Sequence, residues 1–256
     1  MLKTTLLKAT EAGGKILQQY FNGTFEVSSK STLNDLVTEA DKKSESAIIN
    51  VIHETYPDHF ILSEEVGEIR TASNIKWIID PIDGTVNFAN GIPICCVSIG
   101  VEKDGEVVLG AVYNPFMNEL FVAEKGKGAT LNDKPIHVSS KHNVEQSCLV
   151  TGFPYKWEDG LNDPLQVLQY VIREGIPVRR LGSAAIDLCW VACGRFDGFW
   201  EHHLQPWDAA AGYLMVEEAG GKITDFSGNK YSLYQKQILA TNGHIHSGLQ
   251  HLINGK

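Results

Sequence analysis

Residues 77–88 read Trp-Ile-Ile-Asp-Pro-Ile-Asp-Gly-Thr-Val-Asn-Phe. The apolar start predicts a strand, and the strand is expected to end at Pro81, because proline has no N–H to donate to a central ladder. Asp80 and Asp83 then supply two carboxylates at the strand end, and oxygen ligands are what hard cations prefer. Gly84 has no Cβ, so backbone N–H groups next to it can approach an anion closely. The stretch predicts a metal-dependent phosphate site.

On its own, the segment 80–83 is more typical of an ordinary acidic turn. Three other groups of acids favour the metal site, because each lies at the end of a strand or the start of a helix. They are Glu64-Glu65 after the apolar run 60–62, Asp208 in the first turn of a predicted helix, and the stretch 34–41 before a helix that starts near Lys42. A helix dipole favours an ionised carboxylate in the first turn.

These segments resemble the inositol monophosphatase family, which belongs to the lithium-sensitive, magnesium-dependent phosphatase superfamily. Residues 80–88 are similar to its first signature and residues 207–221 to its second. Lys30, residues 35–38 and Asp41 are similar to the segment before its second helix, and Glu64-Glu65 to its acidic pair. The similarity covers nearly the whole chain in the expected order. It implies an α/β fold, the layered αβαβα sandwich of inositol monophosphatase and fructose-bisphosphatase.

The resemblance also implies roles for individual residues. Two magnesium ions, with a third, weaker one near Glu64, are implied to bind Glu64, Asp80, the Ile82 carbonyl, Asp83 and Asp208. Thr85 and Asp41 resemble the pair that orients and deprotonates the attacking water, and Glu64 is also counted among the catalytic residues. Phosphate would be held by the N–H groups of Gly84 and Thr85 at the start of a short helix. No covalent phosphoenzyme is expected.

Contacts with the substrate are predicted for residues from several segments. The predicted set is Asp83, Gly84, Thr85, Arg179, Gly182, Ser183, Ala184, Glu201 and Asp208. Two alternatives stay open, because Glu201 can be a solvated loop acid and the arginines at 179 and 180 a solvated edge. His202 and His203 are predicted to be surface histidines and not zinc ligands, since neighbouring strand residues point to opposite faces.

Composition sets limits on the classes of protein. The chain has 256 residues, 43% of them hydrophobic, and a formal net charge of −9. This length predicts one catalytic domain, 1–256, made of two closely packed halves at roughly 1–150 and 151–256. The negative charge argues against direct nucleic-acid binding. Five cysteines without a CxxC pair predict reduced thiols. With no signal or membrane-spanning pattern, the cytoplasm is the expected compartment.

Periodicity predicts a mixed α/β chain with an antiparallel first half. Helices are expected at 2–20, 42–56, 161–174, 183–193, 208–219 and 244–253. Strand-like runs fill 60–122, and later strands are expected near 177–181, 196–200, 222–225 and 238–241. A hairpin is predicted from Val97–Glu102 and Val107–Tyr113, around the turn at 103–105.

The sequence argues against two functions other than a phosphatase that takes a small phosphomonoester. Haloacid-dehalogenase-type enzymes need aspartates two residues apart, and Ile82 occupies the required position here. A catalytically idle regulatory member would have a damaged ligand set, whereas every expected ligand is present. Within the family, inositol monophosphate is the expected substrate because Val86-Asn87 is unlike the nucleotidase branch. The alternatives are 3′-phosphoadenosine 5′-phosphate, fructose 1,6-bisphosphate and histidinol phosphate. A homodimer and lithium inhibition are implied by the resemblance.

Overall fold

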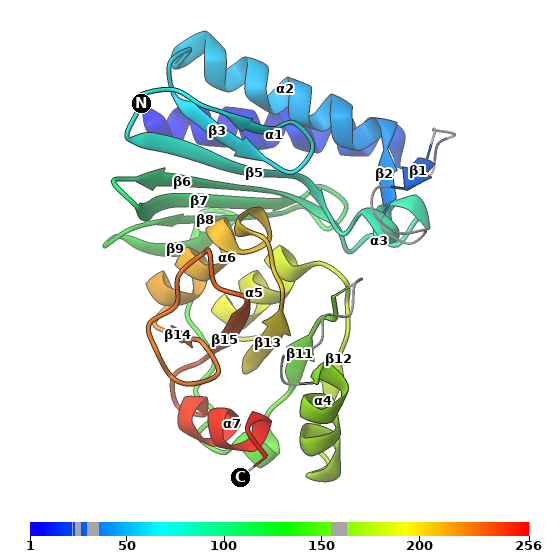
Figure 1. The fold of residues 1–256 in the computed structure, drawn as a ribbon, viewed down its shortest axis with the longest axis vertical. Coiled ribbons are helices and arrows are strands. Elements are labelled where there is room, and N and C mark those ends of the chain that lie inside the picture. The colour runs from blue at the N-terminus through cyan, green and yellow to red at the C-terminus, as the bar shows by residue number, and fades with distance from the viewer. Residues whose placement is uncertain (22, 24–26, 30–35, 155–162, 256) are drawn as a thin grey trace.

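The computed structural model describes residues 1–21, 23, 27–29, 36–154 and 163–255. Its helices and sheets form five layers in the order αβαβα, which confirms the predicted sandwich (Figure 1). The outer layer at the N-terminal end is α1 (Leu2–Tyr20) with α2 (Glu39–Thr55), and α5 (Ala184–Ala192) with α6 (Pro206–Glu218) lies between the two large sheets. The other outer layer is α4 (Pro164–Arg173) with α7 (His246–Ile253).

The larger sheet has eight strands in the order β10-β9-β8-β7-β6-β5-β3-β4. Only the β3–β5 pair is parallel among the pairings within it. The strands are β3 (Phe60–Ser63), β4 (Gly67–Ile69), β5 (Ile75–Asp83), β6 (Cys96–Lys103), β7 (Glu106–Asn114), β8 (Glu119–Glu124), β9 (Gly128–Leu131) and β10 (Lys134–Pro135). Because helices cover both faces, the central strands are buried along nearly their whole length.

The smaller sheet has five strands in the order β12-β11-β13-β15-β14. They are β11 (Leu149–Thr151), β12 (Val178–Arg179), β13 (Gly198–His202), β14 (Lys222–Thr224) and β15 (Gln237–Thr241). The remaining elements are α3 (Thr85–Ala89), the 3-10 turn Val144–Gln146, and a small ribbon of β1 (Val27–Ser29) with β2 (Leu36–Thr38). The sequence prediction did not include β11, which pairs with both β12 and β13.

The predicted hairpin is confirmed as β6 and β7. Asp104 and Gly105 both have positive φ, 53° and 83°, as a two-residue hairpin turn of the primed type requires. Most predicted helices are also present, with ends that differ by a few residues. The first two residues of the helix expected at 161–174 lie outside the described residues, and α4 begins at Pro164 behind an Asp163 cap.

Two predicted boundaries are wrong. β5 does not end at Pro81 but continues to Asp83, because a bulge places Pro81 and Ile82 opposite the single residue Val97 of β6. A proline is tolerated at a bulge, where its missing N–H costs no ladder bond. α2 begins at Glu39 and not near Lys42, since Thr38 and Asp41 form a reciprocal capping box.

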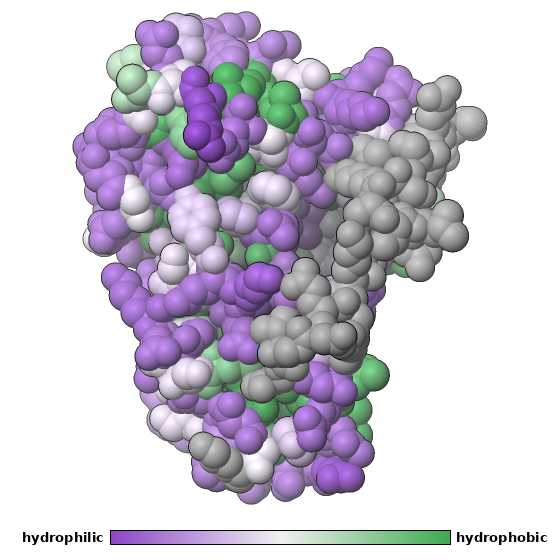
Figure 2. All heavy atoms as spheres, viewed as in Figure 1, coloured by the Kyte–Doolittle hydropathy of each residue, from purple (hydrophilic) through white to green (hydrophobic). Residues whose placement is uncertain are grey.

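Polar residues dominate the face shown in Figure 2, with hydrophobic residues scattered singly or in small groups. Large apolar side chains are buried between the layers, among them Trp77, Phe121, Phe199 and Trp200. No helix in the described part of the chain is both long enough and apolar enough to cross a membrane.

Candidate active site

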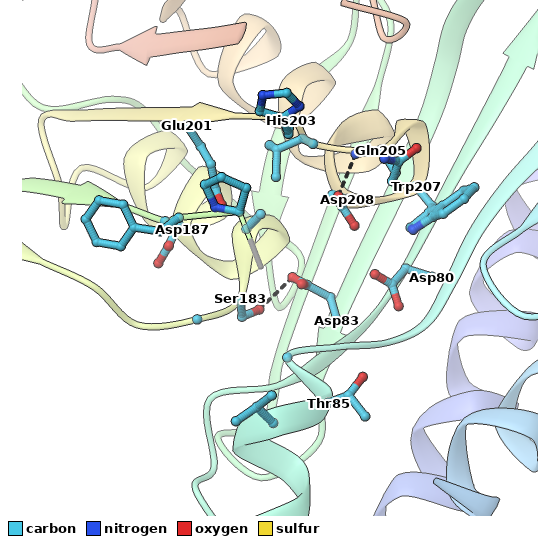
Figure 3. Close-up of a pocket in the computed structure, with 18 of the residues that line it drawn as sticks. Asp80, Asp83, Thr85, Ser183, Asp187, Glu201, His203, Gln205, Trp207 and Asp208 are labelled. Atoms are coloured by element: carbon cyan, nitrogen blue, oxygen red, sulfur yellow. Dashed lines mark hydrogen bonds between the residues drawn. The ribbon is translucent and has the colours of Figure 1, made fainter. Parts of the chain in front are cut away.

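A cavity of about 430 Å³ lies where β5, the start of α3, the start of α5 and the start of α6 meet. Six acids line it: Glu64, Asp80, Asp83, Asp187, Glu201 and Asp208. Arg180 is the one lysine or arginine among the described residues that line the cavity. Figure 3 shows Asp80, Asp83 and Asp208 at one end and Asp187 with Glu201 at the other. We call the first the metal end, after the predicted metal ligands there, and the second the alcohol end, because Glu201 is predicted there to contact the alcohol part of the substrate.

The metal end is assembled by sheet pairing. β3 runs parallel to β5, and the N–H of Glu64 donates to the carbonyl of Ile79 at 3.2 Å, so Glu64 follows its strand to a position beside Asp80. The bulge in β5 separates Asp80 from Asp83 by two residues that face a single partner residue. Asp80 accepts the N–H of Ile82 at 3.0 Å, which fixes the turn of the backbone there.

Asp208 reaches the same place because α6 lies unusually close to the sheet. A Cβ on Gly100 would lie 2.7 Å from the Cβ of Ala210, so this approach requires glycine in the strand. Asp208 is the third residue of α6, and it accepts the N–H of Gln205 at 2.7 Å. The predicted first-turn placement of Asp208 is confirmed.

The acids of the metal end raise one another's pKa. Burial first, and then the neighbouring carboxylates, raise the pKa of Asp80 and of Asp208 well above the usual range. Burial also raises the pKa of Asp83, to about 6, although its hydrogen bonds from Ser183 and Ala185 act in the opposite direction. With Glu64, four acids at least half-buried meet in one place, and they need compensating positive charge to ionise together.

The donor set fits a hard divalent cation in its chemistry, since Glu64, Asp80, Asp83, Asp208 and the Ile82 carbonyl all offer oxygen. The arrangement of these side chains does not by itself form a metal site. In the described ranges, no group of three or more His, Cys, Asp or Glu side chains is arranged so that it could hold a metal ion as it stands. The chemistry and the excess of buried acid therefore favour magnesium, and the magnesium site stays a prediction.

Thr85 and Asp41 lie together, as the pair predicted for water activation must. Thr85 Oγ1 lies 3.2 Å from Asp41 Oδ1 and 3.0 Å from the Ile82 carbonyl oxygen. The other oxygen of Asp41 accepts the Thr38 N–H at 2.7 Å and the Thr38 hydroxyl at 2.6 Å. Burial nevertheless raises the pKa of Asp41 to about 6. Asp41 is fully buried and meets the cavity through Thr85, which lines it.

Most residues predicted to contact substrate also line the cavity. Gly84, the N-cap of α3 with φ of 92°, lies opposite Gly182, Ser183 and Ala184 at the start of α5. Ser183 donates to Asp83 Oδ2 at 2.6 Å (Figure 3). The Ala185 N–H donates to the same oxygen at 2.7 Å. These bonds join the large sheet to α5 across the site.

Three predictions at the alcohol end have different outcomes. Glu201 lines the cavity and is 9% exposed, so it is not a solvated loop acid; burial raises its pKa to about 8. Arg179 is exposed and is not among the cavity-lining residues, which include Arg180 instead. His202 is not a surface residue, because its ring is buried edge-on against Phe226 at 4.7 Å between centroids.

Asp187 and Gly152 line the cavity but are not among the residues predicted from the sequence. Asp187 lies one helical turn after Ser183 on α5, and its position on the same face was the available signal. Gly152 follows β11, which was not predicted. Lys30 and Asp35, which carry part of the family resemblance, lie outside the described residues.

The model of the inositol monophosphatase family matches residues 2–255. An inositol-1-monophosphatase of Synechocystis sp. is 44% identical over 252 residues, covering 97% of this chain and 88% of that protein. Nus factor SuhB of Haemophilus influenzae is 44% identical over 233 residues, covering 90% of this chain and 87% of that protein. A crystal structure of the extragenic suppressor protein suhB from Bartonella henselae superposes with a TM-score of 0.93 at 40% identity, covering 98% of each chain.

Proposed function

Because the chain belongs to the inositol monophosphatase family, we propose that it is a magnesium-dependent phosphomonoester hydrolase acting on myo-inositol 1-phosphate. The observation that carries the proposal is the convergence of four acids on one cavity beside the Thr85–Asp41 pair: the buried Asp80 and Asp83, and the half-buried Glu64 and Asp208. A structural role alone gives no reason to bury so many like charges together.

The residues divide the work of hydrolysis. Magnesium, when bound by the four acids and the Ile82 carbonyl, supplies positive charge for the phosphoryl oxygens and lowers the pKa of water. Thr85 orients the attacking water with its hydroxyl and passes a proton toward Asp41. Glu64, which lines the same cavity, is also counted among the catalytic residues. Backbone N–H groups of Gly84 and Thr85 hold the phosphate, and no residue forms a covalent bond to phosphorus.

The wider predictions belong to the same proposal. The binding partner is a small phosphomonoester substrate, and two to three magnesium ions bind with it in each active site. The protein is proposed to be a cytoplasmic homodimer. Lithium is expected to inhibit it. Support comes from family membership and from the net charge of −9, which disfavours binding to a nucleic-acid backbone. Substrates of related branches, such as 3′-phosphoadenosine 5′-phosphate, fructose 1,6-bisphosphate and histidinol phosphate, are the competing choices.

Phosphate release from these four substrates tests the proposal. Release is measured with magnesium, with EDTA, and with the magnesium restored after EDTA. We expect turnover that depends on magnesium and is fastest with inositol 1-phosphate. A different best substrate would leave the hydrolysis in place and change its branch. Release that is equally fast in EDTA would contradict the metal-dependent mechanism.

A second function, in transcription, is favoured by one observation, since a relative at 44% identity is named Nus factor SuhB. Under this alternative the fold serves as a binding module, and turnover is secondary or absent. A folded protein that releases no phosphate from any of the four substrates with magnesium would favour it over the hydrolase.

A further inference from the structure

Asp187 carries the most unusual polar atom in the cavity. Its side chain is 1% exposed, and Oδ1 has no hydrogen-bond partner among the described residues. A buried acceptor without a partner costs free energy, unless something outside the protein completes it. Asp187 also lines the cavity, so a bound molecule is in position to supply the missing donor.

Glu201 lies next to Asp187, in space that is open because residue 152 is a glycine. A Cβ on Gly152 would overlap both carboxylate oxygens of Glu201, so only glycine allows Glu201 to lie where it does. Glu201 is the largest electrostatic influence on Asp187 after burial, which shows that the two acids lie close together. They come from different elements, α5 and β13, and meet at the alcohol end (Figure 3).

The positive charge of Arg180 favours a neutral hydrogen-bond donor over a cationic one at Asp187 and Glu201. Its positive charge acts on both Asp187 and Glu201 in the direction that favours their ionised forms. An incoming ammonium group would meet that positive charge at the same place. A neutral hydroxyl donates a hydrogen bond to a carboxyl oxygen without adding charge, so the surroundings favour a hydroxyl.

We propose that Asp187 is a specificity-determining residue, whose unpartnered carboxyl oxygen accepts a hydrogen bond from a hydroxyl of the alcohol half of the substrate, beside Glu201. The inference rests on the proposed hydrolase function, which puts the phosphate at the metal end and the alcohol at the other. It favours phosphate esters of alcohols with several hydroxyls, because Asp187 and Glu201 both line the cavity at this end and Asp187 Oδ1 has no partner in the described structure.

The test compares two esters with the same six-membered ring, myo-inositol 1-phosphate and cyclohexyl phosphate, which lacks the ring hydroxyls. The measured quantity is the ratio of their kcat/KM values. In Asp187→Leu, which keeps a similar size without an acceptor, we expect the ratio to fall by about tenfold or more, mainly through KM. Asp187→Asn retains an acceptor oxygen and is expected to keep part of the selectivity. Glu174→Leu, which removes an exposed acid at the end of α4, is the matched control.

Several outcomes would overturn the inference. One is a folded Asp187→Leu protein with an unchanged ratio. Another needs no variant. If wild-type protein hydrolyses the two esters with equal kcat/KM, the ring hydroxyls do not contribute to substrate recognition. A preference for histidinol phosphate that depends on Asp187 would replace the hydroxyl by a cationic amine.

Failure of the hydrolase proposal is recognised separately. If wild-type protein releases phosphate from neither ester, calorimetric titration with myo-inositol alone judges the alcohol end. Binding in the wild type that is lost in Asp187→Leu would support the role of Asp187 without any turnover. Equal binding in both proteins, or none in either, would overturn it.

Discussion

The metal end and the alcohol end of the cavity are both acidic, yet their acids are held differently. At the metal end, backbone N–H groups hold Asp80, Asp83 and Asp208, one from Ile82, one from Ala185 and one from Gln205. At the alcohol end, Asp187 keeps a buried oxygen without a partner in the described structure. Acids that are fixed by main-chain donors are suited to holding an ion in one place. An acid that is left incomplete is suited to binding a molecule that arrives and leaves.

The largest effect should come from breaking the metal end. We expect Asp83→Asn to lower kcat/KM by more than about 1,000-fold, beyond the roughly 10- to 100-fold seen for residues that only support metal ligands. The fold should survive, because the asparagine oxygen can still accept from Ser183 and Ala185. Phosphate release and the melting temperature check the two parts.

A magnesium titration of the melting temperature supplies the control for Asp83→Asn. Wild-type protein should melt higher as magnesium is added, since a ligand that binds only the folded state stabilises it. This shift should be smaller in the variant. A folded variant with wild-type activity would remove Asp83 from the site.

Thr85→Ala should have the next largest effect. The hydroxyl lies 3.2 Å from Asp41, and its loss should lower kcat by about 100-fold with little change in KM, because water activation is disturbed more than substrate binding. Thr85→Ser, which keeps the hydroxyl, is the matched control and should recover most of the rate. A loss confined to KM would contradict the assigned role.

The metal end could be predicted from the sequence, and the reason is local. Asp80, Asp83 and Glu64 follow apolar strands, and Asp208 begins a helix, so residue type and spacing indicated both the chemistry and the place. The bulge at Pro81 was not predictable in this way. It depends on how two strands pair across the sheet, and that register is not written in either strand alone.

The alcohol end was harder to predict, because its residues come from buried elements without polar faces. α5 lies between two sheets and is apolar on nearly every side, so its hydrophobic pattern does not show which face meets the cavity, and the one-turn spacing from Ser183 is the single local signal for Asp187. Asp187 was therefore overlooked. Gly152 owes its importance to the carboxylate of Glu201, about fifty residues away along the chain, and no local pattern reports such a contact.

A smaller effect is expected from Gly152→Ala at the alcohol end. The new Cβ would occupy the space of the Glu201 carboxylate, so Glu201 must move away from the substrate. We expect KM for inositol 1-phosphate to rise about fivefold, the cost of one lost hydrogen bond of about 1 kcal/mol, with kcat nearly unchanged. Gly248→Ala, at an exposed position of α7 where the new Cβ would make only ordinary contacts with Val144, controls for the general effect of adding a methyl group. Unchanged KM would show that Glu201 does not contact the substrate.

The smallest expected effect is on stability. The ionisation of Glu201 at the alcohol end should make the melting temperature depend on pH. Glu201 has a pKa of about 8 in the folded protein, raised from 4.5 by burial. Between these values the folded state keeps a proton that the unfolded chain releases, so the contribution of Glu201 to stability is complete below about 4.5 and is lost as the pH rises to about 8. Glu201→Gln cannot ionise and lacks this loss. In EDTA, the melting temperature of the variant relative to wild type should therefore rise by a few degrees between pH 5 and pH 8. A constant difference over that range would mean that Glu201 is already ionised at pH 5, and that the alcohol end is more hydrated than its burial implies.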